Sequence, residues 1–319
     1  MGLQSELDNL SFSFFPRQRT LNLSSNTLYG SIPYDIGTLS KLTSLDLSSN
    51  QLSGSLPASL ANLAVISYID LSDNRLTGSL SPAFFANWTK LTDLLLFQNR
   101  LTGGIPPEIG LLRSIRWMVL SENPFTGSIP AEIGSLKTLL GVSCDAANLT
   151  GTIPPSLGSL SELQFLAFPD NEISGSIPPT LGNLTKLTHL YLYGNQIMGT
   201  IPQELGNLEN LRPFEVSSNL LVGSIPQTLA NLTNLNHMYL YENQLSGPIP
   251  PQIGNLTRLK ELALYPNKLT GPLPPSTGDL KSLNYLYIHE NQLSGMIPQE
   301  MGNLVGIIWL ATFHPVLAS

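Results

Sequence analysis

Apolar and polar positions recur along this chain about every 24 residues. Residues 184–202 show one copy in full, LTKLTHLYLYGNQIMGTIP, which follows the pattern L-x-x-L-x-x-L-x-L-x-x-N-x-L-x-G-x-I-P. Just before the asparagine, Leu190 and Leu192 alternate with other residues, which predicts a short strand with one buried side. The glycine and the Ile-Pro pair that follow predict a bend and exclude a long helix there.

An asparagine marks the turn of nearly every copy. The turn asparagines are Asn26, Asn50, Asn74, Asn99, Asn123, Asn171, Asn195, Asn219, Asn243, Asn267 and Asn291. Ala147 stands at the one gap in this series. Because a single copy is too small to bury its leucines, the copies must stack into a solenoid with one continuous core. Each asparagine amide can then bond the backbone of its own turn and of the neighbouring coil.

The L-x-G-x-I-P extension, with G-N-L-T or a close variant after it, resembles the plant-type leucine-rich repeat. More narrowly, the chain is similar to the ectodomains of plant leucine-rich-repeat receptor-like kinases over roughly residues 18–312. The resemblance implies an α/β-type repeat solenoid, a right-handed superhelix of about 12 repeats with a parallel sheet on its concave side. It also implies a second short strand near the L-x-G segment and 3₁₀ or loop segments on the convex side.

The two ends of the chain depart from the pattern. We expect a degenerate N-terminal flank at 1–20 and one continuous solenoid domain over 21–319. The flank offers these apolar residues to cover the first coil: Leu7, Leu10, Phe12, Phe14 and Phe15. The last repeat is incomplete, since Leu304, Ile307, Leu310 and Thr312 follow the pattern but Pro315 replaces the asparagine. We expect a truncated or fragmentary copy, or an excised repeat region, rather than a complete receptor, and recognise neither a signal peptide nor a membrane-spanning run in it.

Composition narrows the classes of function. Only 12% of the 319 residues are charged and the net charge is −7, without a cluster of Lys and Arg. The chain therefore lacks the positively charged cluster that is typical of proteins that bind nucleic acid or anionic membranes. Cys144, the only cysteine, occupies a leucine position, so we expect a small buried apolar side chain.

One copy is a residue longer than the others. Between Asn74 and Asn99 the usual Ile-Pro becomes Leu-Ser-Pro, and Phe84, Phe85 and Trp88 follow it. We expect a bulged convex loop there, with a dedicated binding loop as the alternative.

The alternation that sends leucines inward leaves aromatic side chains on the other side of the strands. The residues predicted to bind a ligand are Phe97, Trp117, His189, Tyr191, Tyr193, His237, Tyr239, Tyr241, Tyr265, Tyr285 and Tyr287. The pattern continues through His289, Trp309 and Phe313. Stacked coils place equivalent positions side by side, so we expect an aromatic recognition surface on the concave face. Alternatively, the rings only stabilise the sheet, because tyrosine favours strands and cross-strand stacking.

Charged and titratable residues add little chemistry to this surface. Arg116, Arg212 and Lys260 are available for acidic groups of a ligand. His189 and His237 lie two coils apart, about 10 Å at the spacing of neighbouring strands, which is too far to share one metal ion. Since nothing assembles an acid, a base and a nucleophile, we expect neither enzymatic activity nor a cofactor or metal.

Asparagines in N-x-S/T sequons favour a secretory origin. The predicted glycosylation sites are Asn87, Asn148, Asn183, Asn231 and Asn255. Asn9 and Asn22 also begin such sequons. The resemblance places the parent protein on the extracellular side of the plasma membrane or in the apoplast.

The function that the resemblance implies is recognition of an extracellular peptide or protein on the concave face, with a co-receptor ectodomain as a second partner. One alternative is a secreted inhibitor of cell-wall-degrading enzymes, similar to polygalacturonase-inhibiting proteins, which carry cysteine-paired caps that this chain lacks. Another is a structural or ice-binding solenoid with a flat face of small polar residues, which only the first three coils resemble.

Overall fold

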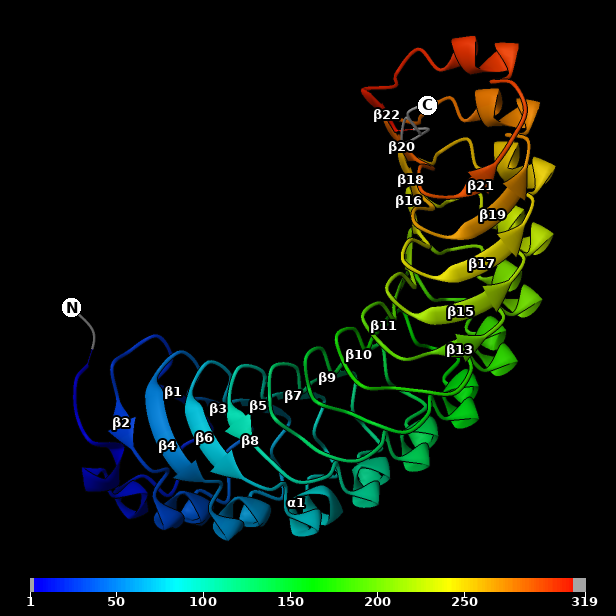
Figure 1. Ribbon diagram of the computed structural model, residues 1–319. Coiled ribbons are helices and arrows are strands. Elements are labelled where there is room, and N and C mark those ends of the chain that lie inside the picture. Colours follow the sequence, from blue (N-terminus) through cyan, green and yellow to red (C-terminus); the bar gives the residue numbers. More distant parts are fainter. Residues whose placement is uncertain (1–2, 312–319) are drawn as a thin grey trace. The chain divides into compact units, whose positions relative to one another are not determined.

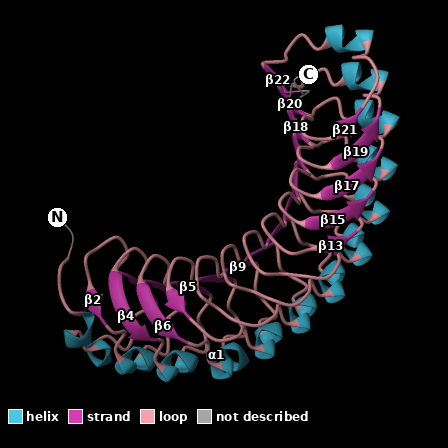
Figure 2. Ribbon diagram, viewed as in Figure 1, coloured by secondary structure: helices cyan, strands magenta, loops and turns pink. Residues whose placement is uncertain are grey.

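The structure is a computed structural model that describes residues 3–311. It divides into two compact units, of which unit 1 contains Met1–Leu163 and Asp170–Glu172. Unit 2 contains Gln164–Pro169 and Ile173–Ser319. Both units are stacks of coils built from a three-residue strand, a turn that in most coils continues into a second short strand, and a short helix (Figures 1 and 2).

In unit 1 the first strands pair in parallel and in chain order. They are β1 (Thr20–Asn22), β3 (Ser44–Asp46), β5 (Tyr68–Asp70), β7 (Asp93–Leu95), β9 (Trp117–Val119) and β10 (Gly141–Ser143). The second strands are β2 (Tyr29–Gly30), β4 (Gln51–Ser55), β6 (Arg75–Gly78) and β8 (Arg100–Leu101). The 3₁₀ helices are η1 (Leu7–Asn9), η2 (Phe12–Phe14), η3 (Tyr34–Thr38), η4 (Ala58–Asn62), η5 (Pro107–Leu111), η6 (Ala131–Ser135) and η7 (Pro155–Ser159). One α-helix, α1 (Pro82–Asn87), replaces a 3₁₀ helix.

Unit 2 repeats the arrangement. Its first strands are β11 (Phe165–Ala167), β12 (His189–Tyr191), β14 (Pro213–Glu215), β16 (His237–Tyr239), β18 (Glu261–Ala263), β20 (Tyr285–Tyr287) and β22 (Trp309–Ala311). The second strands are β13 (Met198–Gly199), β15 (Leu220–Gly223), β17 (Gln244–Gly247), β19 (Lys268–Gly271) and β21 (Gln292–Leu293). The 3₁₀ helices are η8 (Pro179–Asn183), η9 (Gln203–Asn207), η10 (Gln227–Asn231), η11 (Pro251–Asn255), η12 (Pro275–Asp279) and η13 (Gln299–Asn303).

These parallel strands, second strands and 3₁₀ helices confirm the predicted repeat solenoid. The core lies between the first strands and the helices, where leucines from successive coils merge. Leu190, Leu192 and Leu286 are fully buried, as the alternation predicts. Each such side chain contributes about 1.5–3 kcal/mol through burial.

The turn asparagines connect successive coils through the backbone. The Asn219 side-chain oxygen accepts from Ile197 N at 2.9 Å, and its nitrogen donates to Leu192 O at 2.9 Å and Val216 O at 3.2 Å. Because Asn219 is buried, these bonds pair backbone groups that water cannot reach.

At Ala147, where the turn asparagine is missing, Asn171 of the next coil makes some of the hydrogen bonds that an asparagine would make. The Asn171 oxygen accepts from both Ala147 N, at 3.0 Å, and Leu149 N, at 2.9 Å, while its nitrogen donates to Cys144 O at 2.7 Å. The Phe125 amide, which has no asparagine to reach, donates to Asn123 O at 2.8 Å. Cys144 itself is fully buried, and burial raises the pKa of its thiol to about 12.

The predicted convex loop after Leu80 is wrong, because the structure forms α1 there. Pro82 stands in the first helical turn, where its missing N–H is not needed, and the Ser81 hydroxyl accepts from Ala83 N at 3.4 Å. Phe84 and Trp88 stack with ring centroids 4.9 Å apart, and both are buried. The Trp88 indole also donates to Leu60 O at 3.0 Å. The aromatic residues of this segment therefore belong to the core and offer no binding loop.

Residues 3–19 pack against the first coil. Leu7 and Phe12 are buried there, as expected, but Phe14 is 80% exposed and Phe15 is 48% exposed. The last two cover no core, because η2 buries only its first residue, Phe12. At the other end, Thr312, Phe313 and Pro315 lie outside the described residues.

Candidate functional site

The aromatic residues predicted in unit 2 lie on the open face of its first strands, opposite the core. His189 and Tyr191 flank the buried Leu190 on β12, and His237 and Tyr239 flank the buried Met238 on β16. Tyr193, Tyr241, Tyr265, Tyr285 and Tyr287 are half-buried on the same face. The rings are only partly exposed because neighbouring rings cover one another.

Ring contacts join several of these residues into one group, which we call the aromatic cluster. Its members are His237, Tyr239, Tyr241, Tyr265, Tyr285, Tyr287 and His289. Centroids of Tyr239 and Tyr241 are 6.0 Å apart, and Tyr241 stacks on Tyr265 at 5.7 Å. The cluster thus crosses β16, β18 and β20 without interruption. His289 was not among the predicted ligand-binding residues, although its place in the repeat is equivalent to that of Tyr241.

A second, smaller group lies on β11 and β12. The Phe165 ring is 5.5 Å from that of His189 and 5.8 Å from that of Tyr191, between centroids. His189 and Tyr191 are 6.1 Å apart. Strand β14, which carries no aromatic residue on this face, separates this group from the aromatic cluster.

The surface is hollowed at β14, because its residues on this face, Pro213 and Glu215, are shorter than the histidines and tyrosines on each side. The hollow has a volume of about 390 Å³. It is lined by His189, Tyr191, Arg212, Pro213, Glu215, Asn236, His237 and Tyr239. Sequence reasoning missed Glu215 as a site residue. The available signal was the change from HLY at 189–191 to PFE at 213–215 and back to HMY at 237–239.

Burial and like charges perturb the carboxylates and tyrosines around this hollow. Burial, with Glu261 nearby, raises the pKa of the Glu215 carboxyl to about 7. Burial also raises the pKa of Tyr239, whose hydroxyl donates to the Glu261 carboxylate. Burial, and then the charge of Arg212, lowers the pKa of His189, so the imidazole favours its neutral form.

Phe97 and Trp117, the two predicted ligand-binding residues of unit 1, lie outside the aromatic cluster. Phe97 is half-buried, and Trp117 on β9 is 39% exposed. The Trp117 ring lies directly over Gly141, where an added Cβ would meet ring carbons at 2.1 Å. Elsewhere in unit 1 this face carries both polar side chains and the half-buried Leu95 and Val119. Asp70 and Ser72 are buried on it, and the Ser72 hydroxyl donates to the Asp70 carboxylate at 2.6 Å.

The five predicted glycosylation sites have exposed side chains. Asn183, Asn231 and Asn255 are the last residues of η8, η10 and η11, where a glycan has room. Asn148 follows the turn at residues 145–146, and Asn87 ends α1, where its side chain donates to Ala83 O at 3.2 Å. Their glycosylation stays a prediction.

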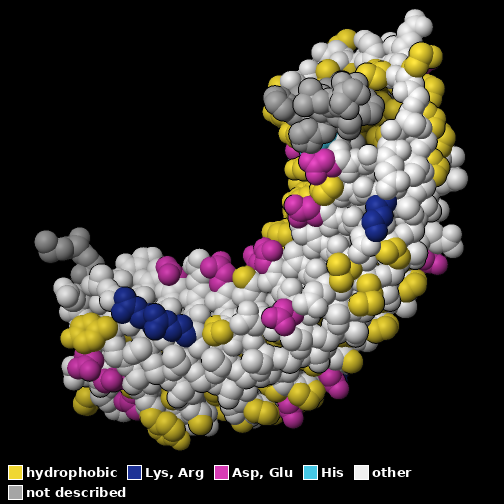
Figure 3. Space-filling model, in the orientation of Figure 1, with side chains coloured by type: hydrophobic (Ala, Val, Ile, Leu, Met, Phe, Trp, Pro, Cys, Tyr) yellow, Lys and Arg dark blue, Asp and Glu magenta, His cyan; other side chains and the backbone are white. Residues whose placement is uncertain are grey.

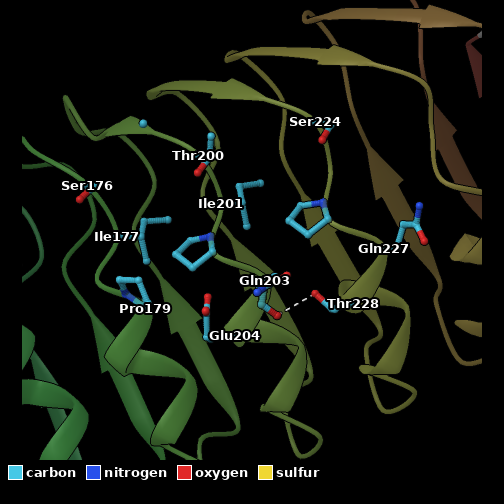
Figure 4. A pocket seen from close by; sticks show the side chains of 13 residues that line it. Ser176, Ile177, Pro179, Thr200, Ile201, Gln203, Glu204, Ser224, Gln227 and Thr228 are labelled. Atoms are coloured by element: carbon cyan, nitrogen blue, oxygen red, sulfur yellow. Dashed lines mark hydrogen bonds between the residues drawn. The ribbon is translucent and has the colours of Figure 1, made fainter.

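A larger hollow of about 920 Å³ lies on unit 2 between the second strands and the 3₁₀ helices (Figure 4). Figure 4 shows Thr200, Ile201 and Glu204 around it, and the Thr228 hydroxyl donates to Gln203 O at 2.7 Å. Among the described residues that line this hollow, Glu204 alone is charged. It therefore offers less specific chemistry than the hollow at β14.

Within residues 3–311, no three His, Cys, Asp or Glu side chains come together as a metal site requires. None of the helices described is long and apolar enough to cross a membrane. On the face drawn in Figure 3, most of the surface is uncharged, and acidic and apolar side chains are scattered over it.

Three family models match this chain, and all describe leucine-rich repeats. The leucine-rich repeat region model matches residues 99–243, and a second leucine-rich repeat model matches 16–76. A third matches 66–87, 234–256 and 282–304. The comparison with curated proteins finds no significant match.

Solved structures of plant receptors are similar to the chain over nearly its whole length. The plant peptide hormone receptor RGFR1 in complex with RGF2 is 34% identical, with a TM-score of 0.92 over 98% of this chain and 50% of that one. The ectodomain of the receptor kinase GASSHO1/SCHENGEN3 from Arabidopsis thaliana, in complex with CASPARIAN STRIP INTEGRITY FACTOR 2, is 33% identical. Its TM-score is 0.86, over 98% of this chain and 40% of that one.

A third plant receptor complex, PEPR1 with AtPEP1, is 33% identical with a TM-score of 0.80, over 99% of this chain and 49% of that one. The chain therefore spans half or less of the length of these three proteins.

Proposed function

The chain belongs to the plant-type leucine-rich-repeat proteins, and we propose that it binds a peptide on the open sheet face of unit 2, as part of an extracellular sensor. The observation that carries this proposal is the aromatic cluster. Rings on three successive coils touch one another there without entering the core.

The cluster has the physical properties of a binding surface. Tyrosine provides a large apolar ring with a polar hydroxyl, so it binds apolar and hydrogen-bonding groups of a peptide alike. Mutual stacking already restricts these rings in the free protein. Little further side-chain entropy is then lost on binding, which favours affinity.

The similar receptors support the peptide as the class of ligand. RGFR1 and PEPR1 were solved in complex with RGF2 and AtPEP1, and the former is called a peptide hormone receptor. By this similarity we expect a non-enzymatic recognition module of a receptor-like protein on the extracellular side of the plasma membrane. A co-receptor ectodomain as a second partner remains an expectation from the family.

The test measures binding of the purified chain to a library of secreted plant peptides. It compares the native protein with the double variant Tyr191→Ala, Tyr239→Ala and with Tyr34→Ala as the matched control. Tyr34 lies on η3 in unit 1 and is 71% exposed, so its loss removes an exposed tyrosine that belongs to the other unit and to a 3₁₀ helix rather than to a sheet face.

We expect the native chain and Tyr34→Ala to capture the same peptides and the double variant to lose them. Equal capture by all three proteins would show that peptides bind elsewhere. Failure of the folded native chain to capture any peptide would contradict peptide binding itself.

A further inference from the structure

The hollow at β14 has a defined position in the sheet. Glu215 pairs in register with Tyr191 of β12 on one side and with Tyr239 of β16 on the other. Neighbouring strands lie about 4.8 Å apart, so the two tyrosine backbones are separated by about 10 Å. The intervening residue is a carboxylate instead of a ring, which leaves room for one side chain of a ligand between the two aromatic walls.

The Glu215 carboxylate has no partner of opposite charge. Within the described residues it accepts no hydrogen bond, and burial and the neighbouring Glu261 are the two influences that act on its ionisation. Glu261 itself accepts from Tyr239. An ionised, half-buried carboxylate without a partner of opposite charge is stabilised by any cation that reaches it.

The other charged and titratable groups around Glu215 come from three coils. Arg212 precedes β14 and lines the hollow too; its side chain is exposed, and its charge acts on His189. His189 and His237 line the same hollow from β12 and β16. The floor is thus anionic at Glu215, and the walls are π faces that attract cations.

We propose that this hollow is a subsite for a cationic side chain, a lysine ammonium or an arginine guanidinium, of the peptide bound by unit 2. The cation pairs with the Glu215 carboxylate, and its aliphatic stem lies between Tyr191 and Tyr239. The inference rests on the proposed function, since it names the chemistry of one position in the same ligand.

The experiment uses the full chain and two small probes, N-acetyl-arginine N-methylamide and its neutral isostere N-acetyl-citrulline N-methylamide. Saturation-transfer NMR measures the binding of each. For so small a ligand the dissociation constant should be on the order of 1 mM. The variants are Glu215→Gln and, as a control with the same change of charge, Glu209→Gln, whose side chain is exposed outside the hollow.

We expect the arginine probe to bind the native chain and Glu209→Gln about tenfold or more tightly than Glu215→Gln, as for one charge-assisted hydrogen bond. The citrulline probe should bind all three weakly. Because the cation favours ionised Glu215, native affinity should also fall about tenfold from about pH 8 to about pH 6. The Glu215→Gln variant keeps any part of the slope that comes from the histidines.

The proposal would be overturned if the native chain bound the arginine and citrulline probes equally well. It would also be overturned if Glu215→Gln bound the arginine probe as tightly as the native chain does. Either result leaves peptide capture on the aromatic cluster unaffected. Loss of peptide capture in the tyrosine double variant, together with unchanged capture by Glu215→Gln, would separate the two proposals.

Discussion

Tyr265 and His289 stack with ring centroids 4.1 Å apart and planes inclined by 22°, which joins the coils of β18 and β20 at one edge of the aromatic cluster. The His289 Nδ1 atom is buried and has no hydrogen-bond partner in the described structure. The imidazole therefore contributes mainly as a flat ring.

The first prediction follows from this contact. His289→Phe keeps the stacking and removes the unpaired nitrogen, so the free energy of unfolding should stay within about 1 kcal/mol of the native value. His289→Ala loses the stacked ring and should cost about 0.5–1.5 kcal/mol. Urea unfolding of the variants measures both changes in the free energy of unfolding. A larger loss of stability for His289→Phe than for His289→Ala would contradict the prediction.

The second prediction separates core from surface on one strand. Leu190→Ala should destabilise the protein by about 2–5 kcal/mol, because it opens a cavity in a fully buried layer. Tyr191→Ala, one residue away on the open face, should cost about 1 kcal/mol or less. The midpoints of denaturant unfolding measure both losses of stability, provided that the unfolding transitions of the variants have equal slopes. A comparable loss for both variants would assign the tyrosine to the scaffold.

The third prediction concerns the asparagine turns. Asn219→Ala leaves Ile197 N and Leu192 O without their partner in a buried turn, so it should cost about 1–3 kcal/mol. Hydrogen exchange of the Ile197 amide should accelerate at the same time, because the protecting acceptor is lost. Asn210→Ala is the control, since this exposed asparagine bonds only Thr185 O. An unchanged exchange rate in Asn219→Ala would refute the assigned role.

The fourth prediction is a pH dependence. The pKa of Glu215 is about 7 in the folded chain and near its ordinary value of 4.5 when unfolded. Between these values the folded state binds more protons than the unfolded state, so the contribution of Glu215 to stability is largest below about pH 4.5 and declines up to about pH 7. Glu215→Gln removes this contribution.

Urea unfolding over this pH range checks the sign. The difference in stability between Glu215→Gln and the native chain should shift in favour of the variant as the pH rises. Solvent screening reduces its size, because the carboxyl is only half-buried. A difference that is independent of pH, or that shifts the other way, would contradict the raised pKa.

The repeat pattern predicted the inward leucines and the turn asparagines because each follows from short-range geometry that recurs in every coil, whereas the 3₁₀ segments were expected from the family resemblance. The loop that the pattern predicted after Leu80 was wrong, because the segment with one extra residue and three aromatic residues contains α1. Proline in the first helical turn and the burial of Phe84 and Trp88 in the core together favour a helix there, and only the burial depends on the neighbouring coils.

The sequence by itself determined which side of each strand carries Tyr191, Tyr239 and Tyr265, since the alternation of a strand has a strict period of two. Only the tertiary structure decided which rings touch between coils, because those contacts depend on the side-chain angles of residues 22 or more positions apart. It also decided that a hollow forms at Glu215 and that the pKa of the Glu215 carboxyl is raised, because both arise from the neighbouring coils. A carboxylate acquires this chemistry from the groups packed around it, and the pattern of a single repeat does not contain them.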